Sequence, residues 1–120
     1  MKLLTKELEK AFEEYPLGSQ ESKGGDAIVI AKFFNSCGAG TWLITEGQKE
    51  ENDFIMFGFC DLGNESFAEL GYVSLNELQN IKIKPLGLGI ERDLHFPKNL
   101  TLREAMKREG YKVPEHLQDS

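Results

Sequence analysis

The feature that most constrains the fold is a nearly uninterrupted apolar run at residues 27–34, which reads Ala-Ile-Val-Ile-Ala-Lys-Phe-Phe. Lys32 is its only charged residue, and most of the others are β-branched or aromatic. A strand with one exposed face alternates apolar and polar residues, whereas a strand buried on both faces does not. The run therefore predicts a central strand that is covered on both faces.

The segments that follow predict an antiparallel sheet. A turn with two glycines at residues 35–40 leads into a second strand at 41–46, and a link this short favours a hairpin. A third strand is expected at 53–60 and a fourth at 69–73. Gly58, inside the third strand, indicates a bulge or the close approach of another backbone.

Three further segments are interpreted from their polar residues, glycines and prolines. Residues 18–25 are rich in glycine and are expected to form a mobile loop. Residues 46–53 are the most acidic stretch and are expected to form a second loop. A turn is expected at Pro85 and the glycines that follow it, and residues 90–96 fit either a fifth strand or an extended segment.

Capping residues and apolar side chains at spacings of three and four predict three helices. The first begins after Thr5 and ends before Pro16. Capping boxes at residues 74–77 and 101–104 begin a short second helix and a last helix, and Gly110 ends the last one.

Together these elements predict an α+β fold: an antiparallel sheet of four to five strands with an N-terminal helix, a short helix after strand four and a C-terminal helix. The 120 residues fit one domain, expected at 1–114, followed by a frayed tail at 115–120. No stretch approaches the ~20 apolar residues of a membrane span, and the charged start argues against a signal peptide. We therefore expect a cytoplasmic protein.

The charge is divided unevenly along the chain. The formal net charge is -6, but residues 82–112 carry +4, which leaves -10 for the rest. If the fold keeps these segments apart, the protein has an acidic and a basic pole that can steer charged partners.

The most suggestive candidate site lies within residues 90–96. If this segment is extended, Glu91, Asp93 and His95 share one face and Arg92 lies on the other. Two carboxylates and an imidazole can bind a divalent metal, so a metal-dependent hydrolase or nuclease is one alternative. The preferred interpretation is a surface of ion pairs and solvated polar groups, because a metal site also needs ligands from elsewhere.

Other residue types give weaker indications of chemistry. Two cysteines, Cys37 and Cys60, are too few for a disulfide scaffold, and their spacing does not suggest a zinc site. The glycines after Cys37 lead into a strand rather than a helix, so neither a phosphate loop nor a nucleophile is favoured there. No cofactor is expected. The aromatic residues of the strands are interpreted as core rather than as a surface that stacks bases, and they are Trp42, Phe54, Phe57 and Phe59.

The last helix carries a basic patch formed by Arg103, Lys107 and Arg108. This patch is the best candidate surface for nucleic acid or an acidic partner. Glu104 is spaced to pair with Arg108, which weakens the patch. Nucleic-acid binding is therefore the second alternative, and a solvated helix face is the simpler interpretation.

The chain carries a series of short motifs at residues 3–5, 29–34, 41–42, 45–47, 57–58, 69–78, 85–88 and 90–96. Their order resembles that of a bacterial family known as domain of unknown function 2958. The resemblance spans about residues 3–100 and leaves the helix after Thr101 outside the family core. The turn at 35–40 departs from the proline-containing turn of the family. The resemblance implies a gene carried by plasmids and other mobile elements, and it carries over no catalytic residues.

These observations favour a small non-catalytic binding or regulatory protein of a mobile element, which acts on an unidentified protein partner as a monomer or weak dimer. The candidate binding surface comprises Glu91, Arg92, Asp93 and His95, together with Trp42 if its side chain is exposed.

Overall fold

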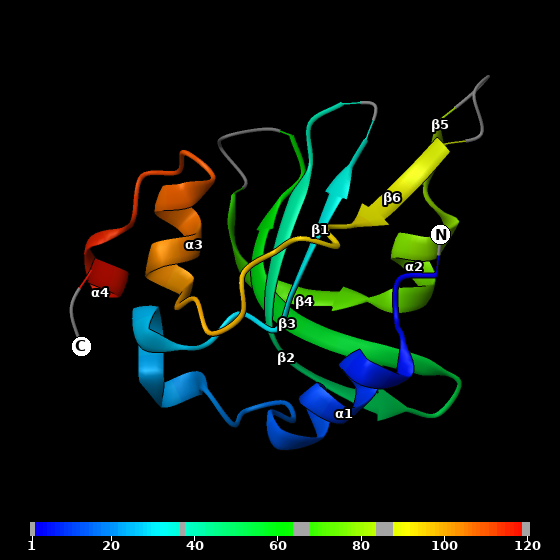
Figure 1. Cartoon of the computed structure of the whole chain (residues 1–120), viewed down its shortest axis with the longest axis horizontal. Coiled ribbons are helices and arrows are strands. Elements are labelled where there is room, and N and C mark those ends of the chain that lie inside the picture. Colours follow the sequence, from blue (N-terminus) through cyan, green and yellow to red (C-terminus); the bar gives the residue numbers. More distant parts are fainter. Residues whose placement is uncertain (1, 37, 64–67, 84–87, 119–120) are drawn as a thin grey trace.

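The computed structural model describes residues 2–36, 38–63, 68–83 and 88–118. Cys37 and the turn expected at Pro85 lie outside the described residues. In chain order the elements are α1 (Lys6–Glu14), η1 (Glu21–Asp26), β1 (Ala31–Asn35), β2 (Thr41–Glu50), β3 (Asp53–Asp61), β4 (Glu69–Ser74), α2 (Leu75–Asn80), β5 (Lys82–Ile83), β6 (Leu88–Arg92), α3 (Leu102–Arg108) and α4 (Glu115–Gln118) (Figure 1).

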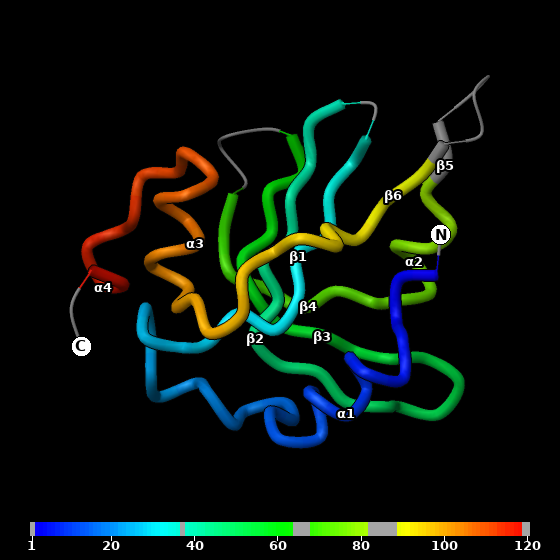
Figure 2. The backbone as a smooth tube through the Cα atoms, viewed as in Figure 1, coloured from blue at the N-terminus to red at the C-terminus, as the bar shows by residue number. Residues whose placement is uncertain are grey.

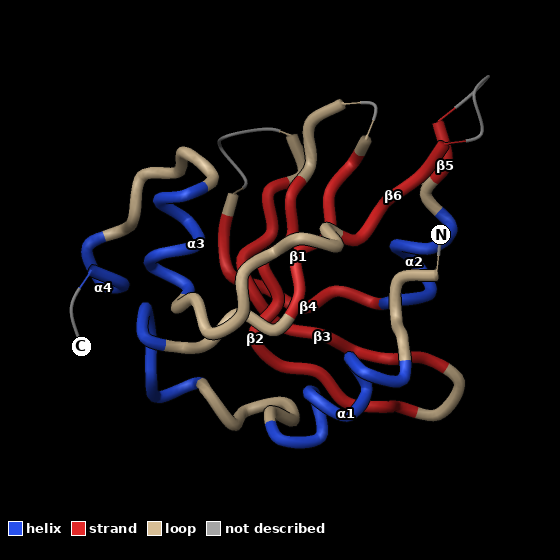
Figure 3. The backbone as a smooth tube through the Cα atoms, in the orientation of Figure 1, coloured by secondary structure: helices blue, strands red, loops and turns tan. Residues whose placement is uncertain are grey.

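The strands form one antiparallel sheet in the order β4-β3-β2-β1-β6-β5, with helices around it (Figure 3). Within the described residues, five strands have five or more residues and β5 has two. The hairpin expected between the first two strands is present, and Phe33 of β1 pairs with Trp42 of β2. The predicted α+β fold, with a helix at each end and a short helix after β4, is confirmed.

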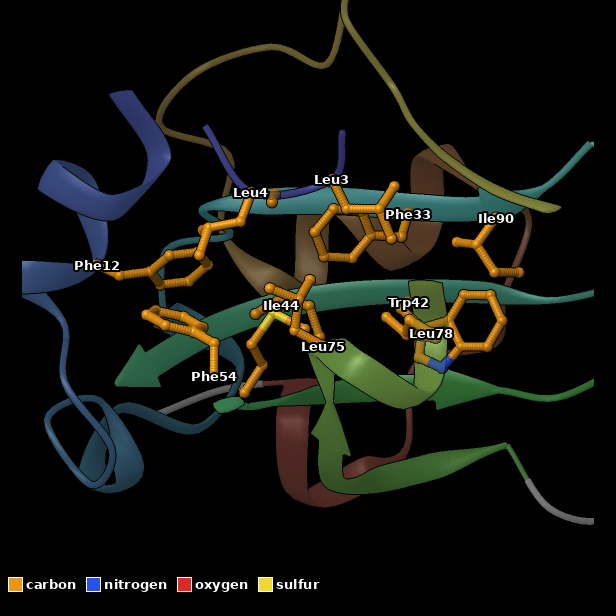
Figure 4. Packing of buried hydrophobic residues seen from close by; sticks show 12 residues of the cluster. Leu3, Leu4, Phe12, Phe33, Trp42, Ile44, Phe54, Leu75, Leu78 and Ile90 are labelled. Carbon is orange, nitrogen blue, oxygen red and sulfur yellow. The ribbon is translucent and has the colours of Figure 1, made fainter. Parts of the chain in front are cut away.

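Both faces of the sheet are buried, as the apolar run predicts. Alternate residues of a strand point to opposite faces. Phe33 and Ile44 therefore join a core beneath α1 and α2, which Figure 4 shows from close by. Val29, Leu43 and Phe59 join a second core against α3 and α4. One sheet thus separates two hydrophobic cores.

The pair formed by β2 and β3 contains the bulge that Gly58 indicates. The register shifts by one residue at Thr45. A Cβ atom on Gly58 would lie only 2.1 Å from the carbonyl oxygen of Leu43. No side chain fits at that distance, so the strands reach this separation only because residue 58 is glycine.

Both segments expected to be loops are more ordered than their polar composition suggests. Strand β2 continues to Glu50 and β3 begins at Asp53, so the acidic loop shrinks to a two-residue turn. Part of the glycine-rich segment forms the 3-10 helix η1, which contacts α3 and α4. The chain therefore passes from α1 to the side of the sheet where α3 lies before it enters β1 (Figure 2).

Two buried polar side chains hold this crossing segment against the sheet. Glu46 is only 3% exposed, and its carboxylate accepts the backbone N–H groups of Gly18 and Gln20, both at 2.8 Å. The Gln20 amide donates to the carbonyl oxygens of Ile28 and Thr45 at 2.8 and 2.7 Å. Its own oxygen accepts the Ile28 N–H at 2.7 Å. Buried polar groups of this kind are stable only when they are paired.

The helix boundaries follow the predicted caps. The Thr5 hydroxyl accepts the N–H of Leu8 at 3.2 Å. Both halves of the capping box between Thr101 and Glu104 are present at the start of α3. Gly110 follows α3 with a φ of 85°, a conformation that glycine adopts without strain.

The segment after residue 114 differs from the expected frayed tail. It forms α4, and Leu117 is buried in the second core. The Nε of Arg103 donates to the Leu117 carbonyl oxygen at 2.9 Å. A tertiary hydrogen bond and one buried leucine therefore order a short segment whose local sequence is polar.

Replacement of Gly58 by alanine tests the close approach of the strands. We expect Gly58→Ala to lower the free energy of unfolding by about 3 kcal/mol, because the added methyl group overlaps the β2 backbone. Its cross-strand partner Gly71 supplies the control, since a Cβ there meets nothing within 4 Å. Gly71→Ala should change stability by no more than about 0.5 kcal/mol in urea unfolding. Equal effects of the two substitutions would contradict the close approach of β2 and β3 at residue 58.

The buried amide is tested by Gln20→Ala. This substitution leaves one N–H group and two carbonyl groups without their partner, so we expect a loss of about 3 kcal/mol in the free energy of unfolding. Gln79→Ala, at an exposed position of α2, is the matched control and should be nearly neutral. A neutral Gln20→Ala variant would show that the network contributes little.

Candidate functional site

The surface expected at residues 91–95 lies where β6 ends. Arg92 pairs with Phe33 of β1, and Glu91 pairs with Phe34. The strand stops at Arg92, and the Asp93 carboxylate accepts the backbone N–H of His95 at 2.9 Å. The alternating arrangement expected for an extended segment therefore does not continue to His95. The chain turns instead because Asp93 closes a local hydrogen bond.

A partly buried ion-pair network lies beneath this turn. The Nζ atom of Lys32 is 2.7 Å from Oε1 of Glu109 and 3.6 Å from Oδ2 of Asp93. The side chains of Lys32 and Glu109 are each 15% exposed. The Asp93 N–H also donates to the Lys32 carbonyl oxygen at 3.0 Å. Lys32 thus fastens both the turn and the end of α3 to the central strand.

The network continues outward to α3 and to the connection that precedes it. Nη1 of Arg108 is 2.8 Å from Oε2 of Glu109. The Arg108 guanidinium also lies over the Phe96 ring, 5.4 Å from its centroid. Lys32 lies over Phe34 at 5.6 Å. Each cation of the network therefore has both a carboxylate and an aromatic partner, an arrangement that stabilises a fixed geometry.

An open depression of about 340 Å³ lies beside Lys32 and Asp93 of this network. The lining residues are Lys32, Phe34, Glu91, Arg92, Asp93, Leu94 and His95. Leu94 is 59% exposed, and it is one of few large apolar side chains that the described residues leave in solvent. The depression thus combines an exposed leucine with positively and negatively charged side chains, and the ion-pair network of Lys32 supports it.

The metal alternative receives no support from this arrangement. Nowhere in the described part of the chain do three or more His, Cys, Asp or Glu side chains gather so as to hold a metal ion. The Asp93 carboxylate is engaged by Lys32 and by the N–H of His95. Glu91 and His95 therefore lack the converging third ligand that a metal site requires.

Trp42 cannot contribute to this surface because its side chain is buried. It is 4% exposed and packs beside Leu78 in the first core (Figure 4). The expectation that Trp42 is a binding residue is therefore corrected. Phe54 and Phe59 are buried as well, which agrees with the interpretation of the strand aromatics as core.

The basic patch of α3 is largely engaged within the protein. Nη1 of Arg103 is 2.7 Å from Oδ1 of Asp26, and Arg108 pairs with Glu109. Glu104 does not pair with Arg108 as expected, because its carboxylate accepts the backbone N–H and the hydroxyl of Thr101. These hydrogen bonds lower the pKa of Glu104. Lys107 remains exposed, so α3 offers nucleic acid one open cation rather than a patch of three.

Cys60 is unsuited to nucleophilic chemistry. Burial, with a smaller contribution from Glu69, raises the pKa of its thiol to about 11. Only the thiolate is strongly nucleophilic, so the side chain is unreactive near neutral pH. Cys37, the cysteine weighed as a nucleophile in the sequence, lies outside the described residues.

Three residues that matter at this site were not singled out from the sequence. Lys32 supplies the central cation, Glu109 supplies its shortest contact and Leu94 supplies the exposed apolar group. Lys32 had a visible signal, because it is the one charge within an apolar strand and such a charge needs a buried partner. No local signal in the sequence marked Glu109, since its partner Lys32 is 77 residues away along the chain.

A family model described as "Protein of unknown function (DUF2958)" matches residues 3–109. The chain belongs to this family. The match includes α3, so the expectation that this helix lies outside the DUF2958 core is corrected. Comparisons with curated proteins and with solved structures find no match. Within the described residues, no helix of this DUF2958 member is long and apolar enough to cross a membrane.

Replacement of Lys32 by methionine tests the role of the network. Lys32→Met removes the cation that two partly buried carboxylates share and leaves Glu109 with Arg108 alone. We therefore expect a loss of about 2 kcal/mol in the free energy of unfolding. Lys107→Met, at an exposed position of α3, is the control and should stay within about 0.5 kcal/mol. Urea unfolding measures both variants. A neutral Lys32→Met would show that the network does not support the surface.

Proposed function

We propose that this chain is a small non-catalytic binding or regulatory protein of a mobile genetic element, which acts in the cytoplasm through contact with another protein. The mobile-element setting rests on what the DUF2958 resemblance implies. The binding surface is the depression around Leu94, with Glu91, Arg92 and His95 at its rim. The protein acts as a monomer or weak dimer.

The exposure of Leu94 is the observation that carries this proposal. A large apolar side chain in solvent has a free-energy cost that a protein partner removes when it covers the side chain. Leu94 lies on a turn that Asp93 closes and that Lys32 fastens to the sheet. A rigid support lowers the entropy lost on binding, which is the usual property of an interaction site.

The polar rim favours a protein partner over a small molecule. The depression is open rather than enclosed, and small ligands bind in pockets that cover most of their surface. Positively and negatively charged side chains surround Leu94, as in the polar rim that encircles the apolar centre of a protein interface.

An affinity capture from host lysate tests the proposal with a matched pair of exposed leucines. Leu94→Asp should lower recovery of a specific partner about tenfold, because it places a charge at the centre of the interface. Leu62→Asp makes the same substitution at a leucine that is 65% exposed and does not line the depression, and it should retain the partner.

Spectra of the two variants must first show that both are folded. Failure to recover any specific partner at low salt would overturn the proposed function. Equal recovery by the two variants would leave protein binding standing but would place it at another surface.

A further inference from the structure

Strand β4 forms one edge of the sheet, and among the described residues its outer side has no strand partner. It pairs with β3 from Glu69 to Ser74, and no described strand lies beyond it. The outer side of an edge strand presents backbone N–H and C=O groups to a new strand. Proteins usually protect such an edge with lysine, proline or a bulge. β4, which reads Glu-Leu-Gly-Tyr-Val-Ser, has neither lysine nor proline, and its register with β3 is regular.

An aromatic side chain stands on this edge. Tyr72 is 70% exposed, more than any other large apolar or aromatic side chain of the described residues. Its ring packs edge-on against Phe57 of β3, with centroids 5.0 Å apart. Gly71, the preceding residue, faces the opposite side of the sheet and leaves open space there. An incoming strand therefore meets a fixed aromatic ring on one face and an open position on the other.

The chain segment that contains β4 carries charge of one sign. Residues 50–81 contain seven Asp and Glu residues and no Lys, Arg or His. Glu69 at the start of β4 and Glu77 in the first turn of α2 are both exposed. The Ser74 hydroxyl accepts the N–H of Glu77 at 3.2 Å, which holds this glutamate beside the other end of the strand. Glu69 and Glu77 therefore place one carboxylate near each end of β4.

Asp53 makes the far end of the edge rigid. Its carboxylate accepts the Ser74 hydroxyl and the backbone N–H of Asn76. The hydrogen bond from Ser74 contributes most to a lowered pKa of Asp53, so this group remains ionised. The strand end is thus fixed before a partner arrives, which reduces the entropy that binding must overcome.

We propose that the outer edge of β4 pairs with an extended, lysine- or arginine-containing segment of a partner protein. The backbone of that segment adds a seventh strand to the sheet, and an apolar side chain packs against Tyr72. Basic residues near its two ends lie close to Glu69 and Glu77. A second copy of this chain is disfavoured as the occupant, because two β4 edges would bring their carboxylates together.

The site is separate from the surface around Leu94. β4 is the first strand in the sheet order, whereas β6, which precedes Leu94, is the fifth. The β4 proposal does not depend on the proposed function, so the two can fail independently.

Nuclear magnetic resonance of the full chain tests the proposal with two synthetic peptides. The first is acetyl-Lys-Val-Thr-Val-Thr-Lys-amide, and the second carries Glu in place of both lysines. We expect the lysine peptide to shift the amide signals of residues 69–74 and to slow their hydrogen exchange, with an affinity that falls as salt is raised. The glutamate peptide should cause no shift at the same concentration.

Charge reversal at the edge supplies the matched variants. The double variant Glu69→Lys with Glu77→Lys should weaken the lysine peptide about tenfold at low salt. Glu13→Lys with Glu14→Lys changes the net charge equally at exposed positions of α1 and should alter affinity less than twofold. Leu94→Asp should bind the peptide as the unmodified chain does.

Several results would overturn the proposal. They are an absence of shifts with the lysine peptide, equal shifts with both peptides, shifts centred outside β4, and concentration-dependent shifts of β4 in the protein alone. The last result would identify a second copy as the occupant. Loss of peptide binding in the Glu13 and Glu14 control would show a general charge effect instead of a site.

Discussion

The buried hydrogen bonds of Gln20 and Glu46 hold together parts of the molecule that the rest of the structure needs in fixed positions. A sheet with a core on each face requires the chain to cross from one face to the other, and the crossing segment cannot form ladder hydrogen bonds throughout. Gln20 replaces them by pairing with the backbone of Ile28 and Thr45. Glu46 pairs with the crossing segment from the sheet side. With this segment satisfied, α1 covers one face while η1, α3 and α4 cover the other.

Coverage of both faces restricts where a partner can bind. The faces of the central strands are filled by the two cores, so the places left for recognition are the sheet edges and the connections. The turn after β6 presents Leu94, and the outer side of β4 presents Tyr72. Both are held by carboxylates that accept hydrogen bonds from their own neighbourhood, Asp93 in one case and Asp53 in the other. The two surfaces differ in charge, since Lys32 and Arg108 balance the first and no basic residue of residues 50–81 balances the second.

Local signals in the sequence predict most of the fold but less of the candidate site. The apolar run around Phe33, the glycine at 58 and the caps at Thr5 and Thr101 act over a few residues or through one strand, and the structure confirms each. The errors arise where a polar residue finds a distant partner. Glu46 begins an acidic stretch whose composition is typical of a loop. It is buried because its carboxylate accepts hydrogen bonds from Gly18 and Gln20, which lie 28 and 26 residues away along the chain. Trp42 was open to either interpretation, and only the packing of α2 over it decides that it is core.

Distant pairing also bears on the basic pole expected at residues 82–112. The pair of Arg108 with Glu109 lies within this segment and leaves its sum of +4 unchanged. Asp26 offsets Arg103 from outside the segment, and Lys32 in turn offsets Glu109, so the segment keeps its excess positive charge. The carboxylates from residue 50 to residue 81 have no cation within their own segment to cancel them. The two segments therefore carry charge of opposite sign, and under the β4 proposal the acidic one is where a basic partner would be steered and held.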